Sequence, residues 1–171
     1  KSAWLWEHQA LTRARFCAGD TGIGLRFEAL RRDVLGQPRD PDEVATKVRE
    51  MRKKMHDGHP NRSALFDLKH DQGGMVDIEF IVQYLVLVHS HEHQSLLDNK
   101  GNIGLLRTAG EAGLIDAGLA STVSDAYRTY RRLQHRLRLN GNNYARTDPE
   151  KISAERAAVR KLWTDTLGDG A

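Results

Sequence analysis

The sequence predicts an all-α protein, a bundle of about six or seven helices around one central apolar helix. Three observations predict this class. Every long segment carries apolar residues at helical spacing, and no run of alternating apolar and polar residues indicates a strand. Aromatic residues make up only 6% of the chain, which is few for a β-sandwich or barrel. With 171 residues, one helical domain over residues 1–171 is expected.

The first three helices are predicted from spacing and from start signals. Residues 2 to 17 and 21 to 35 should form the first two. In the second we expect Leu25, Leu30 and Val34 to point inward. Asp40 precedes Pro41, which is typical of a helix start with the aspartate as N-cap. The third helix should bury one face of four residues at spacings of three and four, namely Val44, Val48, Met51 and Met55.

The second half of the chain contains the central helix. Residues 59 to 73 should form a polar connection with a short extended piece at 65 to 68, and residues 75 to 94 an apolar helix buried on several sides. A short helix at 103 to 112 and a long one that Asp116 caps should follow, with Gly141 beyond its end. Asp148 and Pro149 open the last helix, which should bury Val159, Leu162 and Trp163.

Charge and cysteine content narrow the class of protein. The chain has 26 Lys and Arg against 23 Asp and Glu, an excess too small to indicate a nucleic-acid partner. The longest apolar run, residues 81 to 89, is too short to span a membrane. Cys17 is the only cysteine, so we expect no intrachain disulfide, a small buried thiol and a cytoplasmic location. The first residue is Lys1, which suggests a fragment or a processed chain.

One segment combines residue types that a core does not need. Lys69 could meet a phosphate, and the amides of Gly73 and Gly74 at a helix start could meet an anion. Asp77 and Glu79 lie about 200° apart on a helix, so only one can face a given site. The alternative is a tight loop, with Asp77 beside the helix dipole and Glu79 in a buried ion pair. The residues alone leave both interpretations open.

Other polar clusters favour structural roles. Asp40 and Asp42 have the spacing of a carboxylate pair for Mg²⁺, but helix capping explains both. His89 and His93 stand at i and i+4, yet no third metal ligand accompanies them, and we predict no metal site. A basic stretch on the long helix could bind phosphate or an acidic protein, or could be a solvated face. Its candidate binding residues are Arg128, Arg131 and Arg132.

Three segments together carry a resemblance to a known family. Residues 67 to 85 (DLKHDQGGMVDIEFIVQYL), residues 6 to 15 with 18 to 20, and residues 102 to 115 keep their order along the chain. This pattern resembles the helical domain of glutamine synthetase adenylyltransferase, the bifunctional adenylylating and adenylyl-removing enzyme. That domain is similar to the helical domain of PII uridylyltransferase. Gln72, where Pro or Arg is expected, and Gly104 depart mildly from the pattern.

The resemblance implies a place in a larger enzyme. The run from Val76 to Phe80 (VDIEF) resembles the second, adenylylating half, so the chain would be the C-terminal helical domain that follows a nucleotidyltransferase domain. That domain would carry Gly-Ser and Asp-x-Asp motifs that bind ATP and Mg²⁺. The chain has no Gly-Ser pair, so alone it should be inactive and bind neither cofactor tightly. The implied reaction moves AMP from ATP to a tyrosine of glutamine synthetase and regulates nitrogen metabolism.

The resemblance also suggests roles for residues. Glu7, Arg13 and Arg15, expected on one helix surface, would line the contact with the catalytic domain. Five residues of the central segment would reach the nucleotide or the metal shell, namely Lys69, Gly73, Gly74, Asp77 and Glu79. Asp77 and Glu79 are the catalytic candidates among them. The alternative is a docking and regulatory module without catalytic residues. In that case Arg128, Arg131 and Arg132 would bind glutamine synthetase or the PII signalling protein.

Overall fold

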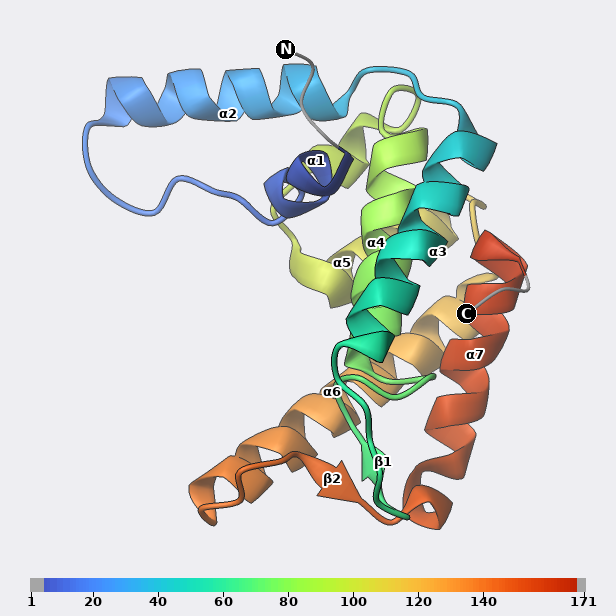
Figure 1. The fold of residues 1–171 in the computed structure, drawn as a ribbon. Helices are drawn as coiled ribbons and strands as arrows, with labels where there is room; N and C mark the ends of the chain where they lie inside the picture. The colour runs from blue at the N-terminus through green and yellow to red at the C-terminus, as the bar shows by residue number, and fades with distance from the viewer. Residues whose placement is uncertain (1–4, 169–171) are drawn as a thin grey trace.

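The protein is a helical bundle, as the sequence predicts. The computed structural model describes residues 5 to 168, and this part of the chain contains seven α-helices, two short 3₁₀ helices and one pair of two-residue strands (Figure 1). The elements in order are α1 (Leu5–Leu11), α2 (Thr21–Leu35), α3 (Pro41–Asp57), β1 (Phe66–Asp67), α4 (Met75–His89), η1 (Gln94–Leu97), α5 (Gly101–Glu111), α6 (Ala117–Leu139), β2 (Arg146–Thr147), η2 (Pro149–Ile152) and α7 (Ser153–Leu167).

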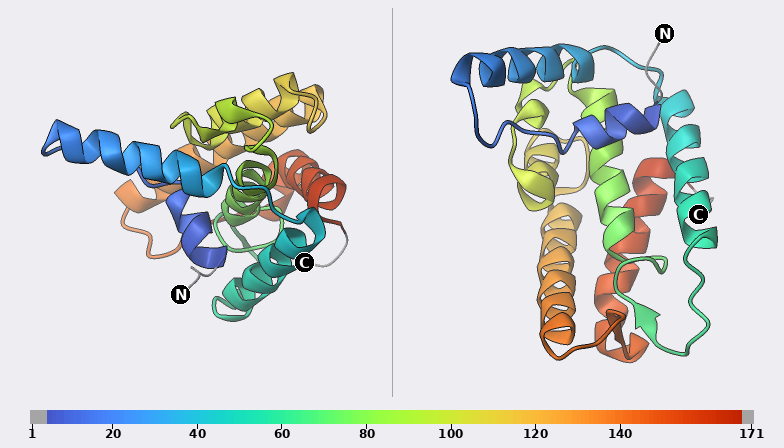
Figure 2. Two further views of the ribbon diagram at one scale, coloured as in Figure 1. Left: turned by 90° about the horizontal axis from the view of Figure 1, so that it is seen from above. Right: turned by 60° about the vertical axis from the view of Figure 1, so that its left-hand side comes forward.

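Helix α4 forms the centre of the bundle. Helices α3, α5, α6 and α7 surround it (Figure 2), and all its residues except Glu79, Gln83 and His89 are buried. An apolar helix covered on several sides was predicted here and is confirmed. It ends at His89, five residues before the predicted end, because Ser90 turns the chain and donates a 2.8 Å hydrogen bond to the Leu35 carbonyl. His93 therefore lies outside the helix.

The predicted caps and the extended piece are confirmed. Asp40, Asp116 and Asp148 each accept backbone N–H groups at the start of the helix that follows. Strand β1 lies within the predicted extended piece and pairs antiparallel with β2, Phe66 opposite Thr147 and Asp67 opposite Arg146. The sequence did not predict this pairing. No helix among the described residues is long and apolar enough to cross a membrane.

Helix α1 is shorter than predicted. It ends at Leu11, where the Thr12 hydroxyl donates a 2.7 Å hydrogen bond back to the Gln9 carbonyl. The next residues run without regular structure until Asp20 caps α2. Arg13 and Arg15 therefore do not share a helix surface with Glu7, and Cys17 is exposed rather than buried. Trp4, which helical spacing places on one face with His8 and Leu11, lies outside the described residues.

Helix α2 turns a different face inward from the one predicted. Its buried residues are Gly24, Arg31 and Leu35, whereas Leu25 and Leu30 are 69% and 62% exposed. The expectation of an inward Leu25 and Leu30 was wrong, because charged groups anchor the C-terminal half of the helix. The Arg31 guanidinium donates to the Leu97 carbonyl and to Glu28, and Arg32 pairs with Asp98 at 2.6 Å.

The N-terminal half of α2 projects beyond the bundle in all three ribbon views (Figures 1 and 2). We call residues 12 to 35, which comprise this helix and the segment before it, the arm. The Phe16 ring lies directly against Gly24, where an added Cβ would come within 2.7 Å of ring atoms. The Phe16 amide also donates to Glu28 at 3.2 Å. These contacts connect the segment before α2 to the helix itself.

Candidate functional site

Asp77, a predicted catalytic candidate, faces the interior. Its carboxylate pairs with Arg52 of α3 and accepts the backbone N–H of Gly73. Both charged side chains are almost fully buried, and Arg52 also donates to the His70 carbonyl at 2.8 Å. Burial raises the pKa of the Asp77 carboxyl, while the Arg52 charge and the Gly73 amide oppose that rise. This geometry fastens the central loop to α3, and a catalytic role for Asp77 stays a prediction.

The two glycines bring the loop against α7. Gly73 has φ +87°, and a Cβ there would lie 3.0 Å from the Arg156 carbonyl. A Cβ on Gly74 would lie 2.8 Å from the Asp71 carbonyl. Tyr130 fixes the loop from the other side by donating to the Gly73 carbonyl at 3.0 Å. Close backbone approach thus explains both glycines, and their predicted contact with a nucleotide stays untested.

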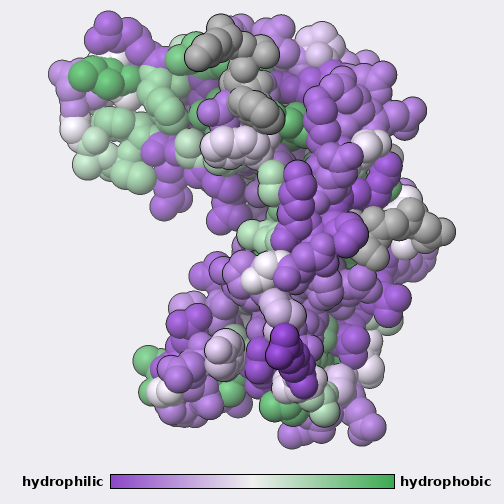
Figure 3. All heavy atoms as spheres, in the orientation of Figure 1, coloured by the Kyte–Doolittle hydropathy of each residue, from purple (hydrophilic) through white to green (hydrophobic). Residues whose placement is uncertain are grey.

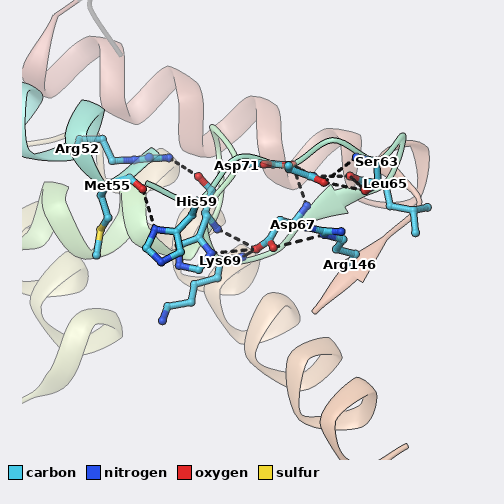
Figure 4. Close-up of polar contacts among 11 residues, drawn as sticks. Arg52, Met55, His59, Ser63, Leu65, Asp67, Lys69, Asp71 and Arg146 are labelled. Atoms are coloured by element: carbon cyan, nitrogen blue, oxygen red, sulfur yellow. Dashed lines mark hydrogen bonds and ion pairs between the residues drawn. The ribbon is translucent and has the colours of Figure 1, made fainter. Parts of the chain in front are cut away.

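Two aspartates shape the loop before the glycines (Figure 4). The Asp67 carboxylate accepts the amides of Lys69 and His70 at 2.9 and 3.0 Å and lies 3.7 Å from Arg146. Asp71 in turn accepts the Asp67 amide at 2.8 Å. The Lys69 side chain is exposed and points away from both carboxylates, so it is available to a partner.

Lys69 lines a hollow of about 300 Å³ beside the strand pair, which also includes His59, His70 and Arg138. The two histidine rings stack with their centroids 4.2 Å apart. Burial lowers the pKa of His70, and the charges of His59, Lys69 and Arg52 lower it further, whereas Asp67 opposes them. His70 therefore favours its neutral form.

Glu79, the second catalytic candidate, belongs to a polar chain on the opposite side of α4 from Asp77. Tyr127 donates its hydroxyl proton to Glu79 at 3.1 Å and accepts from the Asn102 amide at 2.9 Å. The Asn102 side-chain oxygen accepts from Arg13 at 3.1 Å. The half-buried carboxylate of Glu79 is thus linked through two side chains to an exposed arginine of the arm. With the residues that the structure describes, it forms no buried ion pair of the kind that the alternative interpretation assigned to it.

Arg13 lies at a groove together with the predicted basic residues of α6. We call this hollow of about 460 Å³ the basic groove. It lies between the arm, the start of α5 and α6, and its lining residues are Arg13, Lys100, Gly101, Asn102, Ile103, Tyr127, Arg128, Arg131, Arg132 and His135. Arg13 and the α6 arginines, for which the sequence predicted separate contacts, therefore line one surface.

The other predicted contact residues are placed elsewhere. Glu7 on α1 and Arg15 on the arm are exposed and do not line the basic groove. Within the described part of the chain no three His, Cys, Asp or Glu side chains come close enough to hold a metal ion. A metal site built from three such side chains is therefore absent from this part of the chain.

Sequence reasoning missed Arg52, Asn102 and Tyr127 as site residues. Arg52 follows Val48 by four residues on the inward face of α3, and a lone arginine in that register could have indicated a buried partner. Asn102 stands in a segment that carried the resemblance, but its link to Tyr127 spans 25 residues. Tyr127 was expected to be inward, and its hydroxyl contact could not be read from spacing.

The fold and these surfaces define an all-α domain that offers a basic groove and an uncovered arm to other molecules. A family model described as GlnD PII-uridylyltransferase matches residues 42–157, which is more than half of the chain. The chain belongs to this family, and the predicted relationship to the helical domain of PII uridylyltransferase is confirmed.

Curated relatives extend the likeness over nearly the whole chain. The chain is 60% identical over 98% of its length to the bifunctional glutamine synthetase adenylyltransferase/adenylyl-removing enzyme of Bordetella bronchiseptica. It is 56% and 57% identical, also over 98% of its length, to the enzymes of the same name from Burkholderia mallei and Ralstonia nicotianae. In each case the match covers 18% of the relative, so the chain spans about a fifth of these proteins. The predicted resemblance is confirmed.

Proposed function

We propose that this chain is the helical domain of a glutamine synthetase adenylyltransferase/adenylyl-removing enzyme, and that it packs against a nucleotidyltransferase domain of the same polypeptide. That other domain would bind ATP and Mg²⁺ and transfer AMP to glutamine synthetase. The helical domain would complete or cover its site. The identity to enzymes of this name supports the assignment of the parent.

The observation that carries the packing proposal is the uncovered apolar face of the arm. Ile23, Phe27, Leu30 and Val34 follow each other at spacings of four and three, so they form one stripe along α2. Ile23 and Leu30 are 60% and 62% exposed. Figure 3 shows hydrophobic residues gathered over the arm at its upper left, whereas the rest of this face is largely hydrophilic. A contiguous apolar surface of this kind typically marks an interface.

Polar contacts anchor the arm. The Asp20 cap and the Phe16–Glu28 contact lie within it, and the Arg31 guanidinium reaches the Leu97 carbonyl outside it. Ile23 and Leu30 of the apolar stripe stay exposed. An arm that only needed to fold onto its own bundle would turn this stripe inward. The matched relatives extend well beyond the length of this chain, so a further domain of the same polypeptide is the natural occupant.

The test uses the full-length enzyme that contains this chain. The double variant Ile23→Ser/Leu30→Ser should lower the rate of glutamine synthetase adenylylation about tenfold or more, since removing two central apolar contacts weakens the domain contact by about 2–4 kcal/mol. The unfolding temperature of the 171-residue chain should stay unchanged, because both side chains are exposed. Leu139→Ser at the end of α6, where the side chain is 87% exposed, is the matched control and should keep full activity.

Unchanged adenylylation in the double variant would contradict the packing proposal. The alternative proposal, a docking module for glutamine synthetase or PII, rests on the exposed arginines of α6. It predicts instead that substitution of Arg128, Arg131 and Arg132 weakens partner affinity while turnover at saturating substrate is kept.

A further inference from the structure

We infer that the basic groove is a binding site for a diphosphate unit, either inorganic pyrophosphate or the phosphates of a nucleotide. Five of the residues that line the groove are Arg or Lys, and none of its described lining residues carries a carboxylate: Arg13, Lys100, Arg128, Arg131 and Arg132 are the cations. Five cationic side chains are thus gathered at one concave surface.

Two of these arginines have no partner among the described residues. Arg128 pairs with Asp125 at 2.6 Å and Lys100 with Asp98 at 3.2 Å. Neither Arg131 nor Arg132 forms an ion pair or hydrogen bond with any described residue. Solvated arginines are common on helices, but here they face a hollow together with a third arginine from another element. Guanidinium groups bind phosphate oxygens through paired N–H donors.

Arg13 is held in place for such a ligand. Its guanidinium donates to Asn102, which is fixed by Tyr127, which in turn donates to Glu79. This series of hydrogen bonds uses one nitrogen of the Arg13 guanidinium, so its other N–H donors can bind a ligand in the groove. Asn102 and Tyr127 are buried, so the side chains that position Arg13 belong to the packed interior. A positioned cation loses less conformational freedom on binding than a mobile one.

The dimensions favour a diphosphate over a single phosphate or an extended acidic peptide. Arg128, Arg131, Arg132 and His135 stand at i, i+3, i+4 and i+7, so the row is about 10 Å long. The start of α5 adds N–H groups that no side chain caps, with no acidic residue in its first turn. A hollow of about 460 Å³ accepts a compact polyanion. Tyr127 is 5% exposed, so its ring offers no platform for a base.

The test is calorimetric titration of the 171-residue chain with pyrophosphate, ADP, phosphate and sulfate at low ionic strength. Pyrophosphate and ADP should bind more tightly than phosphate or sulfate. Equal affinity for ADP and pyrophosphate would identify the diphosphate alone as the ligand, and tighter ADP binding would identify a nucleotide. The test uses this chain alone, so it does not depend on the proposed docking of the arm.

Matched variants locate the binding. Arg131→Gln/Arg132→Gln should weaken pyrophosphate binding about tenfold or more, and Arg13→Gln about fivefold, since each removes charge-assisted hydrogen bonds. Arg136→Gln/Arg138→Gln removes the same charge from exposed positions of α6 outside the groove and should change affinity by less than about twofold. Circular dichroism should show all three variants folded.

Three results would overturn the inference. Equal weakening by the two double variants would mean that only general charge attracts the anion. Equal affinity for sulfate and pyrophosphate would mean that the groove does not recognise a diphosphate. Displacement of pyrophosphate by a glutamate-rich peptide that binds more tightly would make the groove a protein-docking surface.

Discussion

Replacement of Asp77 by Ala should destabilise the protein strongly, because it leaves Arg52 buried without its counter-charge. Both side chains of this pair are at most 3% exposed. Breaking a buried ion pair by removing one partner costs about 3–5 kcal/mol. The Gly73 amide also loses its acceptor, which adds about 1 kcal/mol. Against a total stability of about 5–15 kcal/mol for a domain, this loss is large.

Urea unfolding at pH 7, followed by circular dichroism, measures the effect. A double-mutant cycle with Arg52→Met and Asp77→Ala should show a coupling of about 2 kcal/mol or more, since the double variant leaves no buried charge. The exposed pair Lys53 and Asp57 on the same helix is the control, and its cycle should show far weaker coupling. A loss below about 1 kcal/mol for Asp77→Ala, or an additive cycle, would refute the reasoning.

Three further predictions follow from the same contacts. Gly73→Ala should lower stability by about 2 kcal/mol more than Gly141→Ala, because both have positive φ but only Gly73 meets backbone atoms, and equal losses would contradict the steric account. Tyr127→Phe should lower unfolding free energy by about 1–2 kcal/mol, measured in urea, through its contacts to Asn102 and Glu79. Since the folded state lowers the pKa of His70, the unfolded state binds protons first as pH falls through about 6.5, so stability should decrease below that pH. His70→Gln should remove part of this decrease. If the variant loses stability with falling pH as the unsubstituted protein does, the role of His70 is contradicted.

The fold could be predicted from the sequence because its strongest signals are local. The apolar run of α4 and the Asp40, Asp116 and Asp148 caps act within a few residues of their own position. The formation of these helices and caps therefore does not depend on the order in which the helices pack. The end of α4 at His89 was missed because it depends on a hydrogen bond from Ser90 to Leu35, which is 55 residues away.

The orientation of α2 could not be predicted for a related reason. Periodicity identifies an apolar stripe but does not say what covers it. In this chain the covered face contains Gly24 and Arg31, held by Phe16 and by the Leu97 carbonyl. The apolar stripe is left outside, as expected of a surface whose partner lies beyond the described residues.

The candidate site was predicted in its residues but not in its arrangement. Asp77 and Glu79 were expected to face different directions, which the structure confirms, but spacing alone did not say which one is internal. The buried partner Arg52 comes from α3, 25 residues earlier, and its ion pair turns Asp77 toward the interior. The hydrogen bond from Arg13 to Asn102 of α5 spans 89 residues and places Arg13 in one groove with the α6 arginines, and no local pattern predicts that contact.

Amide hydrogen exchange tests the proposed docking of the arm most directly. Exchange would be compared between the 171-residue chain and the full-length enzyme that contains it. Amides of residues 12 to 35 should exchange more slowly in the full-length enzyme, while those of α7 should exchange at the same rate in both. Equal exchange in the arm of both proteins would contradict the proposal that another domain covers it.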